Sequence, residues 1–366
     1  MITKKGNMKK LKQGGININL GNSCSNIAYS WAKKTFNNRP DGIGKPLTNL
    51  DGAFSNILNY NGTNIGISSD GIGTKIELAE RTEIYNTIGF DLIAMIADDL
   101  IANGIEMVNF TNILDVDNLD ENIIDSLMEG LNKAANFSNV IVTGGEIAEL
   151  GNRINGYGDK MHFNWCGSGI GILPKGRSAI DGTKIKFGDV IISLKSRGFR
   201  SNGFSLIRKI MSDNFGNNWH ERSYSKDETW GKKLLTPSLI YTPLIKKILD
   251  AKFNIKGITH VTGGGIIDNL ARTLKVSGKG ANIKNPFPPL DVMKEIQKLG
   301  NVPEEQAYRL WNMGNGMLLI VDKTEVDDIL KLIRSKEYEA KECGKITNEN
   351  VITLQTNGND PAKLIN

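Results

Sequence analysis

An aspartate, two glycines and a lysine share one short segment of this chain, Asp70-Gly71-Ile72-Gly73-Thr74-Lys75. The segment follows an apolar run, residues 64–69, that is typical of a strand, and sheets commonly present ligand-binding loops at strand ends. Glycines let the backbone approach a bulky anion, and a carboxylate and an ammonium in one loop suit a metal and a phosphate. The spacing is not that of a Walker loop. We therefore predict a metal and phosphate site here; an Asp-Gly turn with a surface lysine is the alternative.

Three aspartates lie in residues 84–103, a stretch with the apolar spacing of a helix. Asp91 and Asp98 are seven residues apart and share one face of such a helix, whereas Asp99 points elsewhere. Burying a carboxylate without a partner is unfavourable, so at least one of the three is expected to bind a cation or a lysine. Partly exposed helix acids are the alternative.

A second group of glycines and an acid, Thr143-Gly144-Gly145-Glu146, ends the apolar run 139–143. It predicts a second corner for a metal or a phosphate, assisted by Glu149. Two further loops lead into predicted helices: Gly198-Phe199-Arg200-Ser201-Asn202-Gly203 and Thr262-Gly263-Gly264-Gly265. Free backbone N–H groups at a helix N-terminus bind phosphate, and Arg200 adds a donor pair suited to phosphate or carboxylate.

Three other features leave more than one interpretation open. His260 precedes the triple glycine, but a single histidine on a strand is more often a core residue than a catalyst. Cys166 lies among glycines, and the sequence shows no His/Asp pair that could activate it, so we interpret it as a packing residue. Residues 308–316 either line a cleft or pack the second core.

The elements that must position these residues alternate along the chain. Strand 64–69, helix 84–103, strand 107–114, helix 120–135 and strand 139–143 give the order β-α-β-α-β. A glycine-rich strand then runs to residue 173, and Pro174-Lys175-Gly176 is the best linker signal in the chain.

The second half has similar apolar patterns and is predicted to contain further strands and helices. These are strands 190–194, 258–261 and 316–321 and helices 204–212, 237–249, 266–274 and 326–335. Since 366 residues exceed one ordinary core, we predict two α/β domains with mixed sheets. They would span residues 1–173, with a flexible arm over about 1–62, and residues 174–366.

The composition is that of a globular protein without a membrane or nucleic-acid partner. No apolar run approaches the ~20 residues of a membrane span, and the first residues lack the apolar core of a signal peptide. The 45 basic residues are interspersed with 40 acidic ones, giving a net charge of +5 without a dense basic stripe. Three distant cysteines fit no disulfide framework. We therefore expect a protein of the reducing cytoplasm.

Six segments together resemble one family, the aminoimidazole ribonucleotide synthetases, also called phosphoribosylformylglycinamidine cyclo-ligases. The resemblance covers most of the chain and rests on order and spacing. The segments are 70–75 (DGIGTK), 89–95 (GFDLIAM), 144–149 (GGEIAE), 201–209 (SNGFSLIRK), 235–241 (LTPSLIY) and 260–265 (HVTGGG).

The resemblance implies a two-domain fold that dimerises through its N-terminal domain and binds ATP and Mg²⁺ in a cleft near the dimer interface. It implies ATP-driven closure of formylglycinamidine ribonucleotide to 5-aminoimidazole ribonucleotide, with release of ADP and phosphate, in purine synthesis. The implied catalytic residues are Lys75, Asp70 and Glu146. The implied metal ligands are Asp70, Asp98, Asp99 and Glu146. The implied ATP and substrate contacts are Gly71, Gly73, Thr74, Gly144, Gly145, Arg200, Ser201, Asn202, Gly203, Thr262, Gly263, Gly264 and Gly265.

The chain also departs from the family pattern. It has Asp98-Asp99-Leu100 where the family has Asn-Asp-Leu, and Arg200 where the family has histidine before Ser-Asn-Gly. Asn112 stands where the family has a carboxylate. One hypothesis is that Asp98 replaces that charge and Arg200 holds a phosphate. Two other functions stay open: a divergent relative that phosphorylates another small acceptor, and a non-catalytic nucleotide-binding protein.

Overall fold

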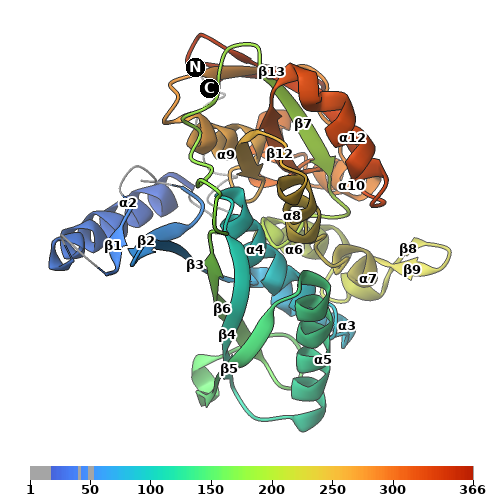
Figure 1. Cartoon of the computed structure of the whole chain (residues 1–366). Helices are drawn as coiled ribbons and strands as arrows, with labels where there is room; N and C mark the ends of the chain where they lie inside the picture. The colour runs from blue at the N-terminus through green and yellow to red at the C-terminus, as the bar shows by residue number, and fades with distance from the viewer. Residues whose placement is uncertain (1–17, 40–42, 48–52, 366) are drawn as a thin grey trace.

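The computed structural model describes residues 18–39, 43–47 and 53–365. Two α/β bodies lie one above the other, and α2 (Ile18–Lys34) with the β1–β2 pair projects to one side (Figure 1). The predicted flexible arm, residues 1–62, lies partly outside the described residues. Among those described, no helix combines the length and the apolar character needed to cross a bilayer.

The first sheet has six strands in the order β1-β2-β3-β6-β4-β5. Only β4 and β5 run parallel, so the sheet is mixed, as predicted. Its strands are β1 (Lys45–Pro46), β2 (Asn56–Tyr60), β3 (Thr63–Gly71), β4 (Glu106–Val116), β5 (Ile141–Glu149) and β6 (Phe163–Ile172). Its helices are α3 (Ile76–Thr82), α4 (Ile88–Ala102) and α5 (Glu121–Ser138).

Alternating glycines in β6 let α4 pack closely on one face of this sheet. A Cβ added at Gly169 would lie 2.6 Å from Ile96 Cγ2 and 2.5 Å from Met107 Sδ, and one at Gly167 would lie 2.2 Å from the ring of Phe110. Real Cβ atoms do not approach so closely, so only glycine fits between strand and helix. The opposite face of the sheet carries no described helix and exposes several isoleucines.

The second sheet has seven strands in the order β10-β12-β7-β13-β11-β14-β15. Strand β12, which lies between β10 and β7, is buried along its whole length. The strands are β7 (Val190–Lys195), β10 (Ile255–His260), β11 (Gly280–Ile283), β12 (Asn315–Val321), β13 (Ala340–Thr347), β14 (Ile352–Gln355) and β15 (Lys363–Ile365). A separate pair is formed by β8 (Ser223–Ser225) and β9 (Glu228–Thr229).

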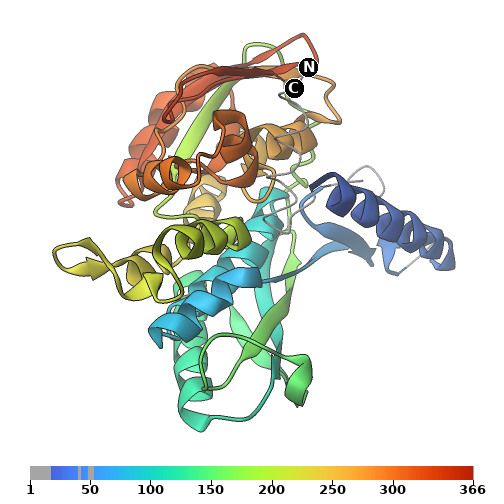
Figure 2. The ribbon, with the colours of Figure 1, turned by 180° about the vertical axis from the view of Figure 1, so that it is seen from behind.

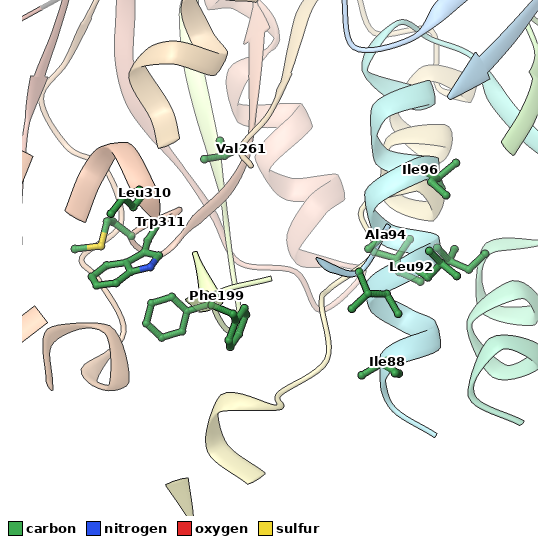
Figure 3. Packing of buried hydrophobic residues seen from close by; sticks show 14 of the residues in the cluster. Ile88, Leu92, Ala94, Ile96, Phe199, Val261, Leu310 and Trp311 are labelled. Carbon is green, nitrogen blue, oxygen red and sulfur yellow. The ribbon is translucent and has the colours of Figure 1, made fainter. Parts of the chain in front are cut away.

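Seven helices accompany the second sheet: α6 (Phe204–Phe215), α7 (Trp230–Leu234), α8 (Thr242–Asp250), α9 (Gly265–Leu274), α10 (Asp291–Leu299), α11 (Glu304–Leu310) and α12 (Val326–Arg334). From behind, α3 of the first body lies beside α6 and α7 of the second (Figure 2). One apolar cluster runs through both bodies, from Ile88 and Leu92 on α4 to Phe199 and Trp311, whose ring centroids are 5.3 Å apart (Figure 3).

The structure shifts several predicted boundaries. The helix expected from residue 84 begins at Ile88, and the helix expected from residue 237 begins at Thr242. The strand expected to end at residue 143 continues to Glu149, so the second glycine and acid group lies inside β5 rather than after it. Glycine lowers strand propensity, but pairing with β4 keeps this segment extended.

Candidate active site at the junction of the two domains

Helix α4 lies where the two bodies meet, because it packs against the first sheet and also against α8 and β10 of the second body. This position explains its three aspartates. Each of them finds a partner on a segment outside the helix, and the carboxylates of Asp91 and Asp98 are fully buried. The prediction that at least one binds a cation or a lysine is confirmed.

The structure places Lys75 in a buried ion pair with Asp91. Its Nζ lies 2.8 Å from both carboxylate oxygens and also donates to the carbonyl of Thr236 at 2.8 Å. Neither side chain is exposed. Burial lowers the pKa of Lys75, although the charge of Asp91 acts in the opposite direction. An ammonium has three donors, so in this arrangement none is left for a phosphate.

The rest of the first loop lies beside the second body. Thr74 Oγ1 is 3.1 Å from Ser205 Oγ at the start of α6. Gly73 and Thr74 are exposed, and Gly73 has a φ of 67°, which favours glycine. The loop after β3 therefore borders the helix that follows the Ser201-Asn202-Gly203 loop.

Asp70 and Asp99 form an acidic pair at this junction. The alternation of β3 puts Asp70 on the face that α4 covers, as for Gly66, whose added Cβ would lie 3.0 Å from Leu100. Burial, partly opposed by the hydrogen bond from the Gly71 N–H, raises the pKa of Asp70 to about 6, and the charge of Asp99 adds to this rise. Burial raises the pKa of Asp99 to about 7, although the charges of Arg272 and Arg200 act in the opposite direction. Two carboxylates that repel each other in a poorly solvated position suit a divalent cation such as Mg²⁺.

Asp98, predicted as a metal ligand, is instead fully engaged by protein groups. One oxygen accepts from Arg200 Nη2 at 2.8 Å, and the other accepts from the backbone N–H groups of Tyr241 and Thr242 and from the Thr242 hydroxyl. The hypothesis that Asp98 replaces a charge missing at Asn112 is not supported, because Arg200 neutralises it. The amide of Asn112 bonds to Trp165 Nε1 at 2.9 Å and to the carbonyl of Gly144 at 3.3 Å.

Two loops from the second body place unused hydrogen-bonding groups next to one another. An added Cβ at Gly263 would lie 3.3 Å from Asn202 Oδ1, and one at Gly203 would lie 2.5 Å from the Trp311 indole. Ser201 Oγ, Asn202 Nδ2 and Trp311 Nε1 are buried without a hydrogen-bond partner. Buried donors are normally paired, so this group suits an anionic ligand with several acceptor oxygens.

The triple-glycine loop begins helix α9. Gly264 and Gly265 have φ values of 98° and 63°, and a Cβ at Gly265 would lie 1.8 Å from the Tyr308 carbonyl. Thr262 is held by Asn269, whose side chain also donates to the Gly265 carbonyl at 2.7 Å. The loop therefore has one defined shape, and its backbone can approach a ligand closely.

The structure keeps Glu146 apart from Asp70. Register pairs Glu146 with Ile113, Ile113 with Cys166, and Cys166 with Gly71. Glu146 and Gly71, the two ends of this row of paired residues, are three strand spacings apart, which is about 14 Å. Ile113 is 47% exposed, so Glu146 points to the open face, opposite to Asp70. Gly144 and Gly145 lie in the same edge strand.

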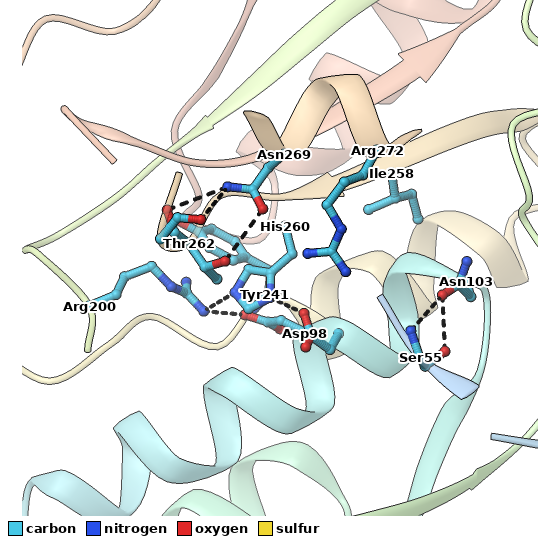
Figure 4. Close-up of polar contacts among 12 residues, drawn as sticks. Ser55, Asp98, Asn103, Arg200, Tyr241, Ile258, His260, Thr262, Asn269 and Arg272 are labelled. Atoms are coloured by element: carbon cyan, nitrogen blue, oxygen red, sulfur yellow. Dashed lines mark hydrogen bonds and ion pairs between the residues drawn. The ribbon is translucent and has the colours of Figure 1, made fainter. Parts of the chain in front are cut away.

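Sequence reasoning left His260 as a core residue, but the structure makes it a link in the site. It is fully buried, its Nδ1 lies 2.7 Å from Asp99 Oδ1, and its Nε2 lies 2.8 Å from Arg200 Nη2 (Figure 4). Its place three residues before the triple glycine was the available signal. Among the described residues, no group of three or more His, Cys, Asp or Glu side chains gathers in a geometry that could hold a metal.

Comparison with known proteins agrees with the two-part architecture. Residues 51–171 match the family described as AIR synthase related protein, N-terminal domain, and residues 186–357 match the corresponding C-terminal domain. A solved HypE–HypF complex has a TM-score of 0.59 at 17% identity, covering 85% of this chain and 92% of that chain. AaThiL complexed with AMPPCP and TMP has a TM-score of 0.58 at 14% identity, covering 86% and 91%. The matches to both family models define the two-domain AIR synthase related class, as predicted.

Curated relatives narrow this class further. The phosphoribosylformylglycinamidine cyclo-ligase of Carboxydothermus hydrogenoformans is 36% identical over 92% of this chain and 95% of its own length. That of Thermococcus kodakarensis is 32% identical over 94% and 98%. This chain belongs to the phosphoribosylformylglycinamidine cyclo-ligase family.

Proposed function

We propose that this protein uses ATP to close formylglycinamidine ribonucleotide into 5-aminoimidazole ribonucleotide, releasing ADP and phosphate, in purine synthesis. One observation carries the proposal: the acidic pair of Asp70 and Asp99 lies at the same domain junction as two loops with unpaired donors and helix N-termini. Acids that suit a cation and donors that suit phosphates are what an ATP-dependent ligase needs in one cleft.

The reaction proceeds by activation of a poor leaving group. The formyl oxygen attacks the γ-phosphorus of ATP, a new P–O bond forms, and ADP leaves. The amidine nitrogen then attacks the formyl carbon, a C–N bond forms, and the C–O bond breaks to release phosphate. Because the protein supplies no covalent group to these steps, positioning and electrostatic stabilisation provide the rate.

The side chains of the junction have assigned parts in this proposal. Asp70 and Asp99 hold Mg²⁺, which when bound would offset the charge of the transferring phosphate. Ser201, Asn202 and the Thr262 to Gly265 loop bind phosphate oxygens of substrate or nucleotide. Lys75 acts from a distance, because its pair with Asp91 fixes the segment that directly follows Asp70. The fold neighbour AaThiL, solved with AMPPCP, supports ATP use by this class.

We further propose that the protein is a cytoplasmic homodimer formed through the open face of the first sheet. Ile141 is 66% exposed, and Ile113, Ile170 and Ile172 are 40–47% exposed, although apolar patches of this kind normally mark interfaces. Glu146 lies on the same face, so pairing of two sheets would bring it to the partner's surface. Cys24, Cys166 and Cys343 are unpaired thiols, consistent with a reducing compartment.

The test is turnover by the purified protein with formylglycinamidine ribonucleotide, ATP and Mg²⁺. Equal amounts of aminoimidazole ribonucleotide and ADP are expected. Asp70→Asn should lower kcat by about a hundredfold or more, as for other groups that stabilise developing charge. Asp125→Asn, which removes an exposed acid on α5, is the matched control and should leave kcat unchanged. ADP formation with a different acceptor only, or nucleotide binding without turnover, would reject the proposed reaction.

A further inference from the structure

Four side chains form a continuous chain of hydrogen bonds across the domain junction (Figure 4). Asp98 accepts from Arg200 at 2.8 Å, Arg200 contacts His260 at 2.8 Å, and His260 contacts Asp99 at 2.7 Å. The two aspartates are neighbours on α4, whereas Arg200 precedes α6 and His260 ends β10. The chain therefore begins and ends on one helix and passes through the other domain.

The chemistry of the guanidinium fixes the direction of every bond in this chain. Arginine has donors only, so Arg200 must donate to His260 Nε2, and that nitrogen must be an unprotonated acceptor. A neutral imidazole carries its one proton on the other nitrogen, so Nδ1–H donates to Asp99 Oδ1.

Arg200 is itself held firmly. Its Nη1 donates to the Leu239 carbonyl at 2.9 Å, and its side chain is 2% exposed. Its φ of 60° is in the left-handed region, which non-glycine residues adopt uncommonly. Asp98, which anchors the other end, also bonds to the first backbone N–H groups of α8. This arrangement leaves the guanidinium one orientation.

Asp98 and Arg200 contact each other directly. Both are positions at which the chain departs from the family pattern, and they lie on opposite sides of the junction. A single change at either one would leave a buried charge unpaired, which is strongly unfavourable. The two residues therefore act as one unit. Through His260 this unit reaches Asp99, the carboxylate that we assign to Mg²⁺.

We propose that Arg200, anchored by Asp98, is a positioning residue that fixes the tautomer of His260 and thereby the orientation of the Asp99 carboxylate, which together with Asp70 would hold Mg²⁺. This inference rests on the proposed function only for the identity of the cation site. A hydrogen-bonded outer residue that sets the tautomer of a histidine, and through it the orientation of a ligand, is an established way to tune metal affinity.

The first experiment reads the tautomer by long-range ¹H–¹⁵N NMR of the full-length protein, which has only three histidines to assign. The expected result is a neutral His260 with its proton on Nδ1. In Arg200→Met this fixed tautomer should be lost, whereas Arg200→Lys, which still only donates, should retain it. A wild-type ring protonated on Nε2, or an Arg200→Met ring unchanged from wild type, would overturn the proposal.

The second experiment measures Mg²⁺ binding by calorimetry in the presence of a non-hydrolysable ATP analogue. Arg200→Met should raise the Kd for Mg²⁺ by at least about tenfold, the lower end of the effect of removing such an outer partner. Arg177→Met is the matched control, because Arg177 also bridges the two bodies, from Glu106 to Asp250, without touching the site. Equal losses in both variants would assign Arg200 a merely structural role and overturn the proposal.

The paired substitution Asp98→Asn with Arg200→His keeps the inference testable if Arg200→Met does not fold, because it leaves no buried charge unpaired. It should fold, lose the single tautomer of His260 and bind Mg²⁺ more weakly. A fixed Nδ1–H tautomer with wild-type Mg²⁺ affinity would overturn the proposal. Since neither readout requires cyclisation, failure of the proposed reaction and failure of this inference are distinguishable.

Discussion

Burial changes what a residue type can do, and Lys75 is the clearest case at the scale of single residues. Its loop suggested an exposed ammonium for a phosphate, whereas the structure pairs it with Asp91 in the interior. The aspartates of residues 84–103 predicted a cation or lysine as a partner, but the sequence could not name Lys75, which lies sixteen residues before Asp91 on another element. Residue type and spacing identified the important positions, and the packing of α4 determined their roles.

Lys75→Met should therefore act on stability as well as activity. Removing one partner of a buried ion pair leaves the other unpaired, so the free energy of unfolding should fall by about 3–5 kcal/mol. Urea unfolding followed by fluorescence measures this loss. The double variant Lys75→Met with Asp91→Leu should recover most of it. A single variant that loses turnover while retaining wild-type stability would instead make Lys75 a direct phosphate contact.

A second titratable pair gives a pH dependence with a defined sign. His162 Nδ1 lies 2.7 Å from Asp117 Oδ2 where the loop between β5 and β6 ends. Burial lowers the pKa of His162, but the hydrogen bond with Asp117 and the charges of Glu80 and Asp117 raise it overall. Burial likewise raises the pKa of Asp117, but hydrogen bonds from His162 lower it overall.

His162 contributes its full stabilisation of the folded state below its unfolded pKa, and this stabilisation is lost as pH rises through its raised folded pKa. Asp117 contributes its full stabilisation above its unfolded pKa, and this is lost as pH falls through its lowered folded pKa. The pair should thus stabilise most between about pH 4 and 6.5, the two unfolded values. The stability difference between wild type and Asp117→Asn should be largest near pH 5.5 and shrink above pH 7. NMR titration should also show a lower pKa of His162 in the variant; an unchanged pKa would contradict this account.

At the scale of elements, β6 is defined by the absence of side chains over part of one face. The sequence predicted a glycine-rich strand here, but it did not show why the glycines are needed. The alternate glycines on one face receive α4, which a single sequence does not reveal because the helix lies some seventy residues earlier. Periodicity predicted β3, α4, β4, α5 and β5 in the right order, whereas β1, β2 and α3 were not predicted. Shorter strands such as β11 and β14, four residues each, carry too little pattern and were not predicted.

Gly169→Ala tests this packing. Its new Cβ would lie 2.5 Å from Met107 Sδ and 2.6 Å from Ile96, so the helix or the strand must move. Overpacking of this kind should lower the free energy of unfolding by about 1–3 kcal/mol. Asn164→Ala, at an exposed position of the same strand that faces the open side, is the control and should change stability by less than about 0.5 kcal/mol. Equal effects in thermal unfolding would contradict the proposed role of the alternating glycines.

At the scale of the whole molecule, the open face of the first sheet and the domain junction are separate features. The junction joins residues far apart in the sequence, such as His260 and Asp99, which are 161 positions apart, and no local pattern predicts such contacts. The family resemblance identified the loops that meet there. It did not anticipate the ion pair between Asp98 and Arg200, since that pair exists only where the chain departs from the family pattern.

Charge on the open face should separate the subunits of the proposed dimer. Ile113→Lys places an ammonium on a face that would otherwise be buried, so the variant should elute as a monomer in size-exclusion chromatography with light scattering. Phe187→Lys, at a residue 66% exposed elsewhere, should leave the dimer intact. A monomeric wild-type protein at micromolar concentration would contradict dimerisation through this face.

The most direct test of the central claim follows the formyl oxygen. Substrate labelled with ¹⁸O in the formyl group is converted with ATP and Mg²⁺, and the released phosphate is analysed by mass spectrometry. The proposed chemistry predicts one ¹⁸O atom in each phosphate and one aminoimidazole ribonucleotide for each ADP. Phosphate without ¹⁸O, or ADP released without the imidazole product, would contradict it.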